Sequence, residues 1–420
     1  MARARGANAL MAGAFESVYG TPPVSGYKRL PFVSSNLGEE QGLIADDLLG
    51  FGREALAPSF DVINNVGDVV VPVDVRNFGN WLKLYFGNPA TSGGVAAKGS
   101  ILFSAQPANS STIAIAGTAF TFVSSAPSGN QIQIGANLAA TLTNAVTVLN
   151  ASVVPAVAAA TYAQTGGNTL TITHDTLGQA GNSFALAATA PSNGAISGAT
   201  LSGGATQHVF TSGASTLPSM SIEVGLPDVP TYGMNFGVRG NTMRIGMQRS
   251  GLLSATLGLI AKGETKAGAT AAGTPSVAEV KRFSQFTGSV KREGAQLASV
   301  VSAEFTFTNN LEPVETIRSD GRIEDADPGM VGMSGSIVTR FADTVLLDQA
   351  QSGAPCEISF GWAIDASTSL LFLVPAVYLP RAKQPVSGPG GVQATFNWQA
   401  ARGAAGATCI ATLVNDVASY

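Results

Sequence analysis

The chain has 420 residues, of which 45% are apolar and only 12% are charged, about half the ~25% charged share of an average globular domain. Its net charge is -4 and it has no run of Lys or Arg, which excludes a protein that reads DNA sequence, because such proteins draw much of their affinity from neutralising phosphates. So few charges indicate that other subunits cover much of the surface. The 49 glycines and the many Ala, Ser and Thr residues favour short strands joined by turns, so the composition predicts a mainly β assembly protein.

Export, membrane insertion and a cysteine-based site are not predicted. Cys356 and Cys409 are too few for a disulfide framework or a closed zinc site, and we expect both in the core. The stretch up to Glu16 lacks the apolar core of a signal peptide. The longest apolar run, residues 370–379, is far shorter than the ~20 residues that span a bilayer, and Pro375 interrupts it. We expect no membrane partner and a cytoplasmic location before assembly.

The first 99 residues contain a strand and a short helix. Valine alternates with other residues over residues 67–76, which predicts a half-buried strand. An apolar stretch at residues 81–85 follows, with Asn80 as the expected helix cap and Gly87 as the stop. We assign residues 1–99 to the N-terminal part of a strand-rich unit.

Residues 100–206 are almost free of charge but clearly patterned. A pair of alternating strands is predicted at residues 112–123. Asn137 offers a cap for a helix whose apolar residues share one face over residues 138–149. Alternation returns at residues 168–174. These periodicities predict a small inserted α+β module, whereas the alternative, a disordered linker, would not show them.

Flexible joins at residues 92–94 and 203–204 are expected to connect this module to its neighbours. Residues 207–280 are assigned to the continuation of the first unit. They include residues 263–276, which are rich in Gly, Ala, Thr and Lys and have little to bury. We expect a long mobile hairpin loop there, and a disordered linker is the alternative that the sequence leaves open.

The chain repeats itself in its second part. Residues 335–360 show the pattern of residues 67–87, in which a strand is followed by Phe, an Asn or Asp cap and a short apolar helix. Each copy then runs to a proline and an alternating strand, at residues 218–224 and 355–360. We infer a tandem duplication with residues 281–420 as the second copy, and chance alignment is the alternative.

A catalytic or metal-binding constellation is not evident in the sequence. The two histidines, His174 and His208, each stand alone, without a partner at ligand spacing. The nearest approach to a cation site is an acidic loop that lacks the register of a calcium loop. Its members are Asp320, Glu324, Asp325 and Asp327. A solvated turn is the simpler interpretation, so we expect neither an enzyme nor a cofactor.

Several segments in order along the chain carry a resemblance. They are residues 16–23 (Glu-Ser-Val-Tyr-Gly-Thr-Pro-Pro), 30–31 (Leu-Pro), 67–87, 217–223 (Leu-Pro-Ser-Met-Ser-Ile-Glu) and 412–415 (Thr-Leu-Val-Asn). In this order they resemble the tail tube proteins of tailed bacteriophages. Residues 112–203 are similar to accessory modules of phage structural proteins. The motifs are loose, and their specificity lies in their order over nearly the whole chain.

The resemblance implies a tail-tube-type β-sandwich or barrel fold with short flanking helices. In that family, copies form rings whose inner strands join into one barrel, and DNA passes through the lumen during genome ejection without sequence-specific binding. Rings usually have six subunits, so a duplicated chain implies three. Partners are then further copies of the chain and other tail proteins at the tube ends. The expected location is the virion tail, after synthesis in the host cytoplasm.

The resemblance also suggests which residues contact neighbours. Candidates for contacts between rings are the N-terminal arm and four residues of the predicted loop: Gly263, Lys266, Thr270 and Ser276. Candidates for an acidic lumen that repels phosphate are Asp320, Glu324 and Asp327. An alternative function is a phage adhesion or receptor-binding component with the module as its working part. A cell-wall glycan hydrolase is a third, for which the chain offers few paired carboxylates.

Overall fold

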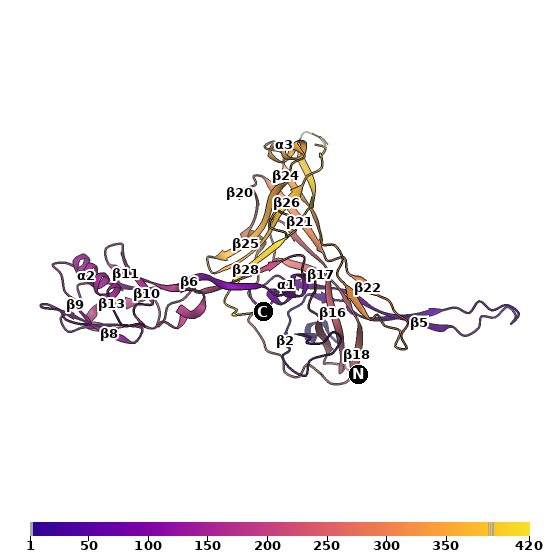
Figure 1. The fold of residues 1–420 in the computed structure, drawn as a ribbon, viewed down its shortest axis with the longest axis horizontal. Coiled ribbons are helices and arrows are strands. Elements are labelled where there is room, and N and C mark those ends of the chain that lie inside the picture. The colour runs from indigo at the N-terminus through magenta and orange to yellow at the C-terminus, as the bar shows by residue number, and fades with distance from the viewer. Residues whose placement is uncertain (1–2, 385, 387, 389) are drawn as a thin grey trace.

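The computed structural model describes residues 3–384, 386, 388 and 390–420. Antiparallel strands dominate these residues, which also form three α-helices. In Figure 1 a central β body carries two long lateral projections, one containing α2 and the other formed by β4 and β5, and the upper end of the body contains α3. The predicted mainly β fold with short helices is confirmed.

The body has two halves. The first contains β1 (Leu10–Phe15), β2 (Lys28–Arg29), β3 (Ser34–Ser35), β4 (Gly38–Ile44), β5 (Ser59–Pro72), α1 (Phe78–Phe86), β15 (Met220–Leu226), β16 (Thr231–Met247), β17 (Ser254–Ala261) and β18 (Gly263–Ala267). The second contains β19 (Gly288–Arg292), β20 (Ala295–Gln296), β21 (Val300–Thr308), β22 (Glu312–Val314), β23 (Asp325–Asp327), β24 (Gly332–Arg340), α3 (Val345–Ser352), β25 (Cys356–Asp365), β26 (Thr368–Tyr378), β27 (Gln393–Ala400) and β28 (Ile410–Asn415).

A further set of elements lies between α1 and β15. They are β6 (Ala90–Phe103), β7 (Thr112–Ile115), β8 (Thr118–Val123), β9 (Gln131–Gln133), α2 (Leu138–Asn150), β10 (Ala160–Thr165), β11 (Thr169–Leu177), β12 (Leu186–Ala188), β13 (Gly194–Ile196) and β14 (Ala205–Thr211). Most of them form the first lateral projection, and β14 joins it to the body by pairing with β28.

In the first half, β16 takes part in two sheets. Its residues 239–245 pair with β17, which pairs with β5, and β5 pairs on its far side with β3 and β4. Its residues 231–238 pair with β15 and β18, and β15 continues to β1 and β2. Side chains from both sheets, among them Val69 and Ile222, are buried in one core. The first half is thus a β-sandwich whose two sheets share one long strand.

The second half repeats this set of strand pairings in the same chain order. The strands of the first half, β1, β2, β3 with β4, β5, β15, β16, β17 and β18, correspond in that order to β19, β20, β21, β24, β25, β26, β27 and β28 of the second. Each pairing of the first half then has its equivalent in the second: β3/β4–β5 matches β21–β24, β5–β17 matches β24–β27, β17–β16 matches β27–β26, β16–β15 matches β26–β25, β15–β1 matches β25–β19, β1–β2 matches β19–β20, and β16–β18 matches β26–β28. A short helix follows the equivalent strand in each half, α1 after β5 and α3 after β24.

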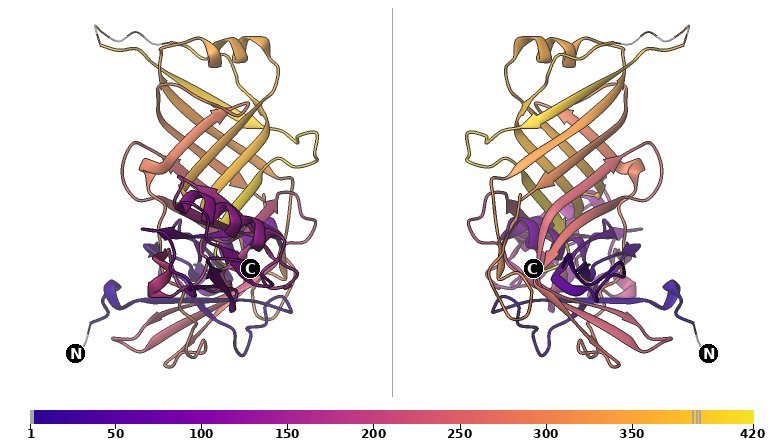
Figure 2. Two further views of the ribbon diagram at one scale, coloured as in Figure 1. Left: turned by 90° about the vertical axis from the view of Figure 1, so that its left-hand side faces the viewer. Right: turned by 90° about the vertical axis from the view of Figure 1, so that its right-hand side faces the viewer.

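The two halves are joined edge to edge. Because β16 also pairs with β21, the strands β4, β5, β17, β16, β21, β24 and β27 form one continuous antiparallel sheet. On the opposite layer β28 pairs with β14, which pairs with β6. One hydrophobic cluster runs through both halves, and the rings of Phe305 and Trp398 both contact Phe360, at centroid distances of 5.1 and 5.7 Å. Figure 2 shows the second half as two layers of strands above the first.

A buried carboxylate sets the start of helix α1. Asp74 accepts hydrogen bonds from the backbone N–H groups of Asn77 and Phe78, at 2.7 and 2.8 Å, so the helix begins at Phe78. The predicted cap at Asn80 is therefore wrong, because this residue lies inside the first turn. The predicted stop is correct, since Gly87 follows the helix with a φ of 89° that glycine adopts without strain.

The lateral projection with α2 has its own hydrophobic cluster, formed by side chains between residues 97 and 201. Asn137 caps α2 as predicted, because its side-chain oxygen accepts a hydrogen bond from Ala140 N at 2.9 Å. β6 is one strand of 14 residues that pairs with β14 near the body and with β11 and β13 farther out. Residues 92–94, expected as a flexible join, lie inside this strand.

Residues 263–276 differ from the expected mobile hairpin, because they run along the first half. They begin with β18, which pairs with β16. The Glu223 carboxylate on β15 then accepts a hydrogen bond from Thr270 Oγ1 at 2.6 Å. Ser276 N donates to Tyr27 O at 2.9 Å. The hairpin that does extend from the body is the one formed by β4 and β5, which we call the arm and define as residues 38–72.

Candidate functional site: a polar sheet face and an acidic arm

The continuous sheet has one buried face and one polar face. Directly opposed residues on neighbouring strands point to the same face, so the register fixes the composition of each row. One buried row comprises Leu257, Met243, Phe307 and Met333. The row beside it, on the other face, comprises Val70, Thr256, Arg244, Thr306, Ser334 and Gln399. A further polar row comprises Gly246, Glu304, Ser336 and Asn397. We call this surface the polar face, and its side chains are mainly hydroxyls and amides.

Opposite charges on the polar face are paired. Arg244 Nη2 lies 2.6 Å from Glu304 Oε2, across the junction between β16 and β21. The hydrogen bond that Arg244 donates to this carboxylate raises the pKa of Arg244 above its usual value, so the guanidinium stays charged at any physiological pH. The pair is net neutral, and the other side chains of the two polar rows named above carry no charge.

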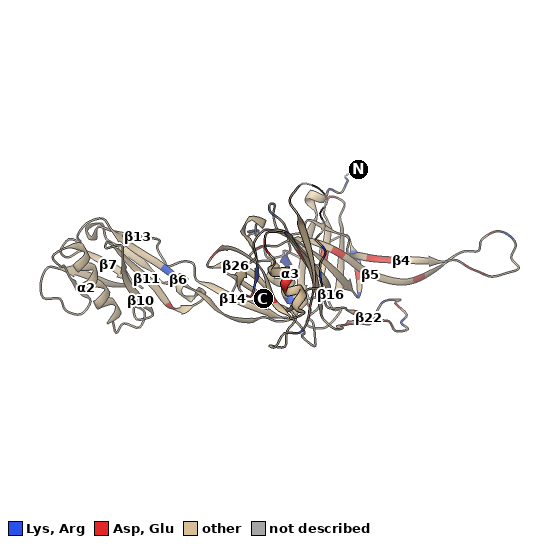
Figure 3. Ribbon diagram, turned by 90° about the horizontal axis from the view of Figure 1, so that it is seen from above, with Lys and Arg blue, Asp and Glu red and all other residues tan. Residues whose placement is uncertain are grey.

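The arm combines acidic and apolar side chains. Its charged residues are Glu39, Glu40, Asp46, Asp47, Arg53, Glu54, Asp61 and Asp68, so acidic groups greatly outnumber the single basic one. Figure 3 shows acidic groups along β4 and β5. Eight large apolar side chains of the arm are more than half exposed: Leu43, Ile44, Leu48, Leu49, Phe51, Phe60, Val62 and Val66. So large an exposed apolar set on one projection is typical of a protein-binding surface.

The three acidic residues predicted for a lumen lie beside the arm, on or near the hairpin of β22 and β23. Asp320 lies in the tip and pairs with Arg318 at 3.1 Å, and this hydrogen bond lowers the pKa of Asp320. Glu324 and Asp327 are exposed farther down the same hairpin. The structure therefore gathers all three residues on one hairpin, which forms a separate two-stranded sheet.

This acidic hairpin is fastened to the arm. Ile63 N of β5 donates a hydrogen bond to Gly321 O at 2.9 Å. Arg322 of the hairpin forms an ion pair with Glu39 of β4 at 2.7 Å, and both side chains are at most a quarter exposed. The hydrogen bond to Glu39 raises the pKa of Arg322. The base of the arm and the acidic hairpin thus form one structural unit.

The four residues predicted for ring contacts lie along the first half. Gly263 is buried and Lys266 is exposed on β18, where Lys266 pairs with Glu264 at 3.4 Å. Thr270 and Ser276 are held by the hydrogen bonds described above. The Lys266 side chain is 65% exposed, so the fold leaves it available to a neighbour.

Sequence reasoning missed the arm. Its strand β5 was predicted to begin at residue 67, whereas it begins at Ser59. A usable signal was the cluster of Leu48, Leu49 and Phe51 beside acidic residues, which fits neither the strand nor the helix period. Apolar residues without a period have no core to face, so they indicate a surface for another molecule.

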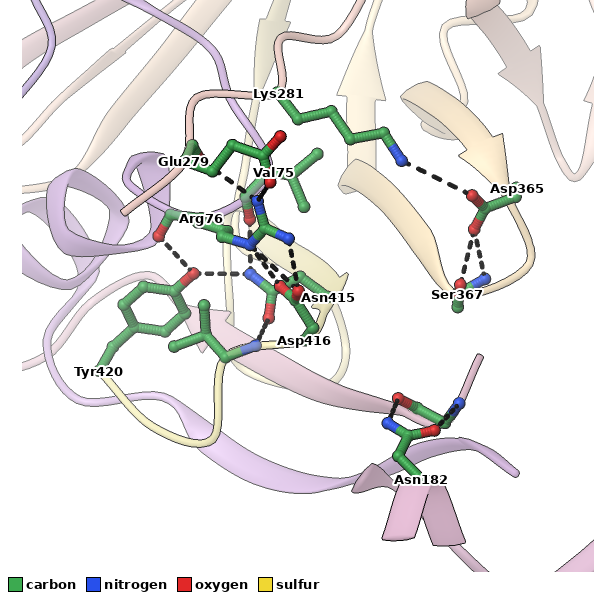
Figure 4. A network of polar contacts seen from close by, with 12 residues as sticks. Val75, Arg76, Asn182, Glu279, Lys281, Asp365, Ser367, Asn415, Asp416 and Tyr420 are labelled. Carbon is green, nitrogen blue, oxygen red and sulfur yellow. Dashed lines mark hydrogen bonds and ion pairs between the residues drawn. The ribbon is translucent and has the colours of Figure 1, made fainter. Parts of the chain in front are cut away.

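A polar network fastens the end of the chain to the first half (Figure 4). Arg76, after β5, lies between Asp416 at 2.7 Å and Glu279 at 2.9 Å. Tyr420 Oη donates to Arg76 O at 2.8 Å. The hydrogen bond from Arg76 lowers the pKa of Asp416, and burial raises the pKa of Tyr420. Because Asp416 follows β28 and Glu279 lies in the segment that enters the second half, this network ties the two halves together.

Within the described residues, no cluster of three or more His, Cys, Asp or Glu side chains is arranged to hold a metal ion. Across the same residues, each helix is too short or too polar to cross a membrane. Cys356 and Cys409 are both unpaired and buried, as the sequence predicted.

The fold, the polar face and the arm describe a subunit with large surfaces for other subunits. Among curated proteins, none matches the sequence. The family model of the phage tail tube protein matches residues 6–400, nearly the whole chain. The protein therefore belongs to the phage tail tube family and is a structural subunit of the virion tail.

Proposed function

We propose that three copies of this chain close into a ring, and that stacked rings form a tube whose lumen is lined by the polar face. DNA passes through this lumen during genome ejection without sequence-specific binding. Membership of the tail tube family supports a self-assembling tube. The observation that carries the ring of three is the repeat of the strand pairings in both halves.

The repeat extends to the register of the shared sheet. Residues 64–70 of β5 pair with residues 34–40 as residues 332–338 of β24 pair with residues 302–308. Equal topology at equal register supports a tandem duplication. Three duplicated subunits then supply six equivalent sandwiches to the ring, the number usual for this family.

The polar face suits a lumen wall. Hydroxyl and amide groups hydrate well but offer no fixed positive charge, and tight binding to DNA depends on neutralising its phosphates. The pairing of Arg244 with Glu304 removes the positive charge at the centre of this face. The acidic hairpin with Asp320, Glu324 and Asp327 adds repulsion for phosphate at the arm side.

Rings are proposed to stack through the arm. Its exposed leucines and phenylalanines need a protein surface to cover them, and a neighbouring ring is within the reach of an extended hairpin. The exposed Lys266 and the N-terminal residues before β1 are second candidates for the same contacts. Contacts with other tail proteins at the tube ends use the same surfaces.

Electron microscopy of the purified protein tests this proposal through the rotational symmetry of end-on views. Tubes with three-fold symmetry and six lobes around a hole are the expected result. Six-fold symmetry would keep the tube but contradict the ring of three duplicated subunits. Compact particles that never form rings would contradict the tube itself.

A second candidate function, adhesion to the host cell, is favoured by one observation. The projection with α2 has a separate core and stands away from the body. Asp175 is its only Asp, Glu, Lys or Arg between residues 100 and 206, so its surface offers mostly Ser, Thr and Asn side chains. A binding assay of the protein on host cells tests this function independently of tube formation.

A further inference from the structure

The chain contains one junction between its own two sandwiches. This internal junction is a template for the junction between neighbouring subunits. β16 and β21 pair with Thr242 opposite Thr308 and Arg244 opposite Thr306. By the repeated topology, β26 is the equivalent of β16, and β3 with β4 is the equivalent of β21. A closed ring of identical subunits needs the same junction again, between β26 of one subunit and β3 and β4 of the next.

One side of the required junction is formed by residues 34–40. These residues occupy the position of residues 302–308, so Glu40 stands where Thr308 stands in the internal junction. Among the described residues, β3 and β4 pair with no strand other than β5. The edge is therefore open to a further strand.

In the single subunit, the outward N–H groups of this open edge donate hydrogen bonds to side chains. The N–H groups that correspond to those of Phe305 and Phe307 belong to Leu37 and Glu39. Leu37 N donates to Ser35 Oγ at 3.4 Å, and Glu39 N donates to Glu264 Oε2 at 3.2 Å. Such contacts can be exchanged for the carbonyl groups of an incoming strand at little cost, because each N–H keeps a partner.

The other side of the junction is the continuation of β26. Tyr378 opposes Gln399 of β27 as Arg239 opposes Ile260 of β17. Counting onward, Arg381 takes the position of Thr242. Lys383 likewise takes the position of Arg244. The exposure of residues 377–384 follows the same order as that of residues 238–245, which supports this alignment.

Two details of the sequence agree with this alignment. Pro380 takes the position of Asn241, where the ladder between β16 and β17 shifts register. Proline lacks an N–H and is accepted in strands at such irregular positions. Ala382 takes the position of buried Met243 and packs against the same core.

We propose that residues 377–384 of one subunit pair with residues 34–40 of the next in the register of the internal junction, with Arg381 opposite Glu40 of the neighbouring subunit. This inference rests on the proposed ring and names its closing contact. Arg381, Lys383 and Glu40 are charged, with opposite signs on the two edges. Among the described residues, none of the three forms an ion pair within the subunit.

The internal junction has a Thr–Thr pair at this position, so the two junctions differ in chemistry although they share a register. Opposite charges directly across two strands stabilise their pairing, and like charges oppose it. The Arg381–Glu40 pair thereby selects the correct edge of a neighbour and discourages pairing of two equal edges. It is a specificity contact for ring closure.

Disulfide cross-linking of the assembled full chain tests the register. Glu40→Cys combined with Arg381→Cys is expected to link neighbours under mild oxidation, giving a band series that ends at three chains. The matched control is Glu40→Cys with Ala382→Cys, because a shift of one residue turns the side chain to the opposite face. The native cysteines are buried, and burial raises the pKa of both thiols, so they stay unreactive.

Charge reversal tests the ion pair separately. Arg381→Glu alone and Glu40→Arg alone are expected to lose ring formation at physiological salt, and the double exchange is expected to restore it. Arg402→Glu, at another exposed arginine, should assemble like the wild type. If wild-type rings form but the 40–381 cysteine pair stays unlinked, or the control pair links equally well, the register is overturned. If the wild type forms no rings, the proposed tube fails, and the closing contact fails with it.

Discussion

The ring of Tyr420 lies against Gly79 of helix α1, at a point where the helix has no room for a side chain. A Cβ atom at Gly79 would overlap the carbon atoms of the tyrosine ring. The ring also contacts His208 edge to face at 4.8 Å, and its hydroxyl group donates to Arg76 O. The last residue of the chain therefore packs on the first helix, and glycine is required for this contact.

Gly79→Ala is expected to destabilise the protein by about 1–3 kcal/mol, because the tyrosine must leave its site. The second change Tyr420→Ala is expected to remove this loss of stability, because it removes the ring that alanine at position 79 would overlap. In that background alanine at position 79 should be neutral or stabilising by up to about 1 kcal/mol, since alanine favours helices over glycine. Thermal unfolding of the two single variants and the double variant measures this coupling. Additive effects would show that the two residues are independent.

The ion pair of Arg244 and Glu304 gives a second prediction. Both side chains are well exposed, so Glu304→Gln should cost no more than about 1 kcal/mol, a loss of a few degrees in Tm at most. The loss should shrink as salt is added. Ring formation should persist, because this pair lies within one chain. Loss of rings in this variant would indicate that the internal junction itself depends on the pair.

The network around Arg76 predicts a dependence on pH. The folded-state pKa of Asp416 is lowered by its hydrogen bond from Arg76, so its stabilising effect is present above the unfolded pKa of about 3.9 and disappears as pH falls through the folded value. Asp416→Asn should therefore lower Tm by a few degrees at pH 7 and by progressively less below about pH 4. A difference that stays constant with pH would contradict an ionic role for this carboxylate.

The sequence predicted those parts of the fold that depend on local pattern. The cap at Asn137 and the stop at Gly87 are local rules, and the structure confirms both. The start of α1 was predicted three residues too late, because its first N–H groups bond to Asp74, which lies before the helix and inside the core. A capping side chain that lies outside the helix does not alter the spacing of the apolar residues, so this spacing does not reveal it.

Long-range partners explain the larger differences. Residues 263–276 contain no large apolar side chain, yet they are held by Glu223 and Tyr27, which lie far from them in the sequence. The continuous sheet depends on the pairing of β16 with β21, and neither strand indicates its partner in the sequence. The polar face could be predicted only after this register was known, since Ser and Thr occur throughout the chain.

The polar face predicts how DNA responds to added charge. Ser334→Lys and Gln399→Lys together place two cations in one row of this face. Tubes of this variant should retain DNA and release it as salt rises, because phosphate binding weakens steeply with salt. The matched control is Thr147→Lys, at an exposed position of α2 on the lateral projection. Equal DNA retention by both variants would place the lumen elsewhere.

The neutral changes Asp320→Asn, Glu324→Gln and Asp327→Asn test the acidic hairpin in the same way. If repulsion by this hairpin keeps DNA moving, the triple variant should slow genome ejection, most clearly at low salt where charges are least screened. The ion pair of Arg322 with Glu39 is retained in this variant, so the arm should keep its place. An unchanged ejection rate would show that the hydroxyl-rich face is sufficient.

Removal of the lateral projection separates tube formation from adhesion. Val95 of β6 opposes Ala205 of β14, so residues 96–204 can be replaced by Asn-Gly, a two-residue turn that suits an antiparallel hairpin. The body should keep its stability, because its cluster contains no side chain from the excised segment. Tubes should form with a thinner outline, and cell binding should fall only if the projection is the adhesive part. Failure to form tubes, with the body still folded, would instead show that the projection takes part in ring contacts.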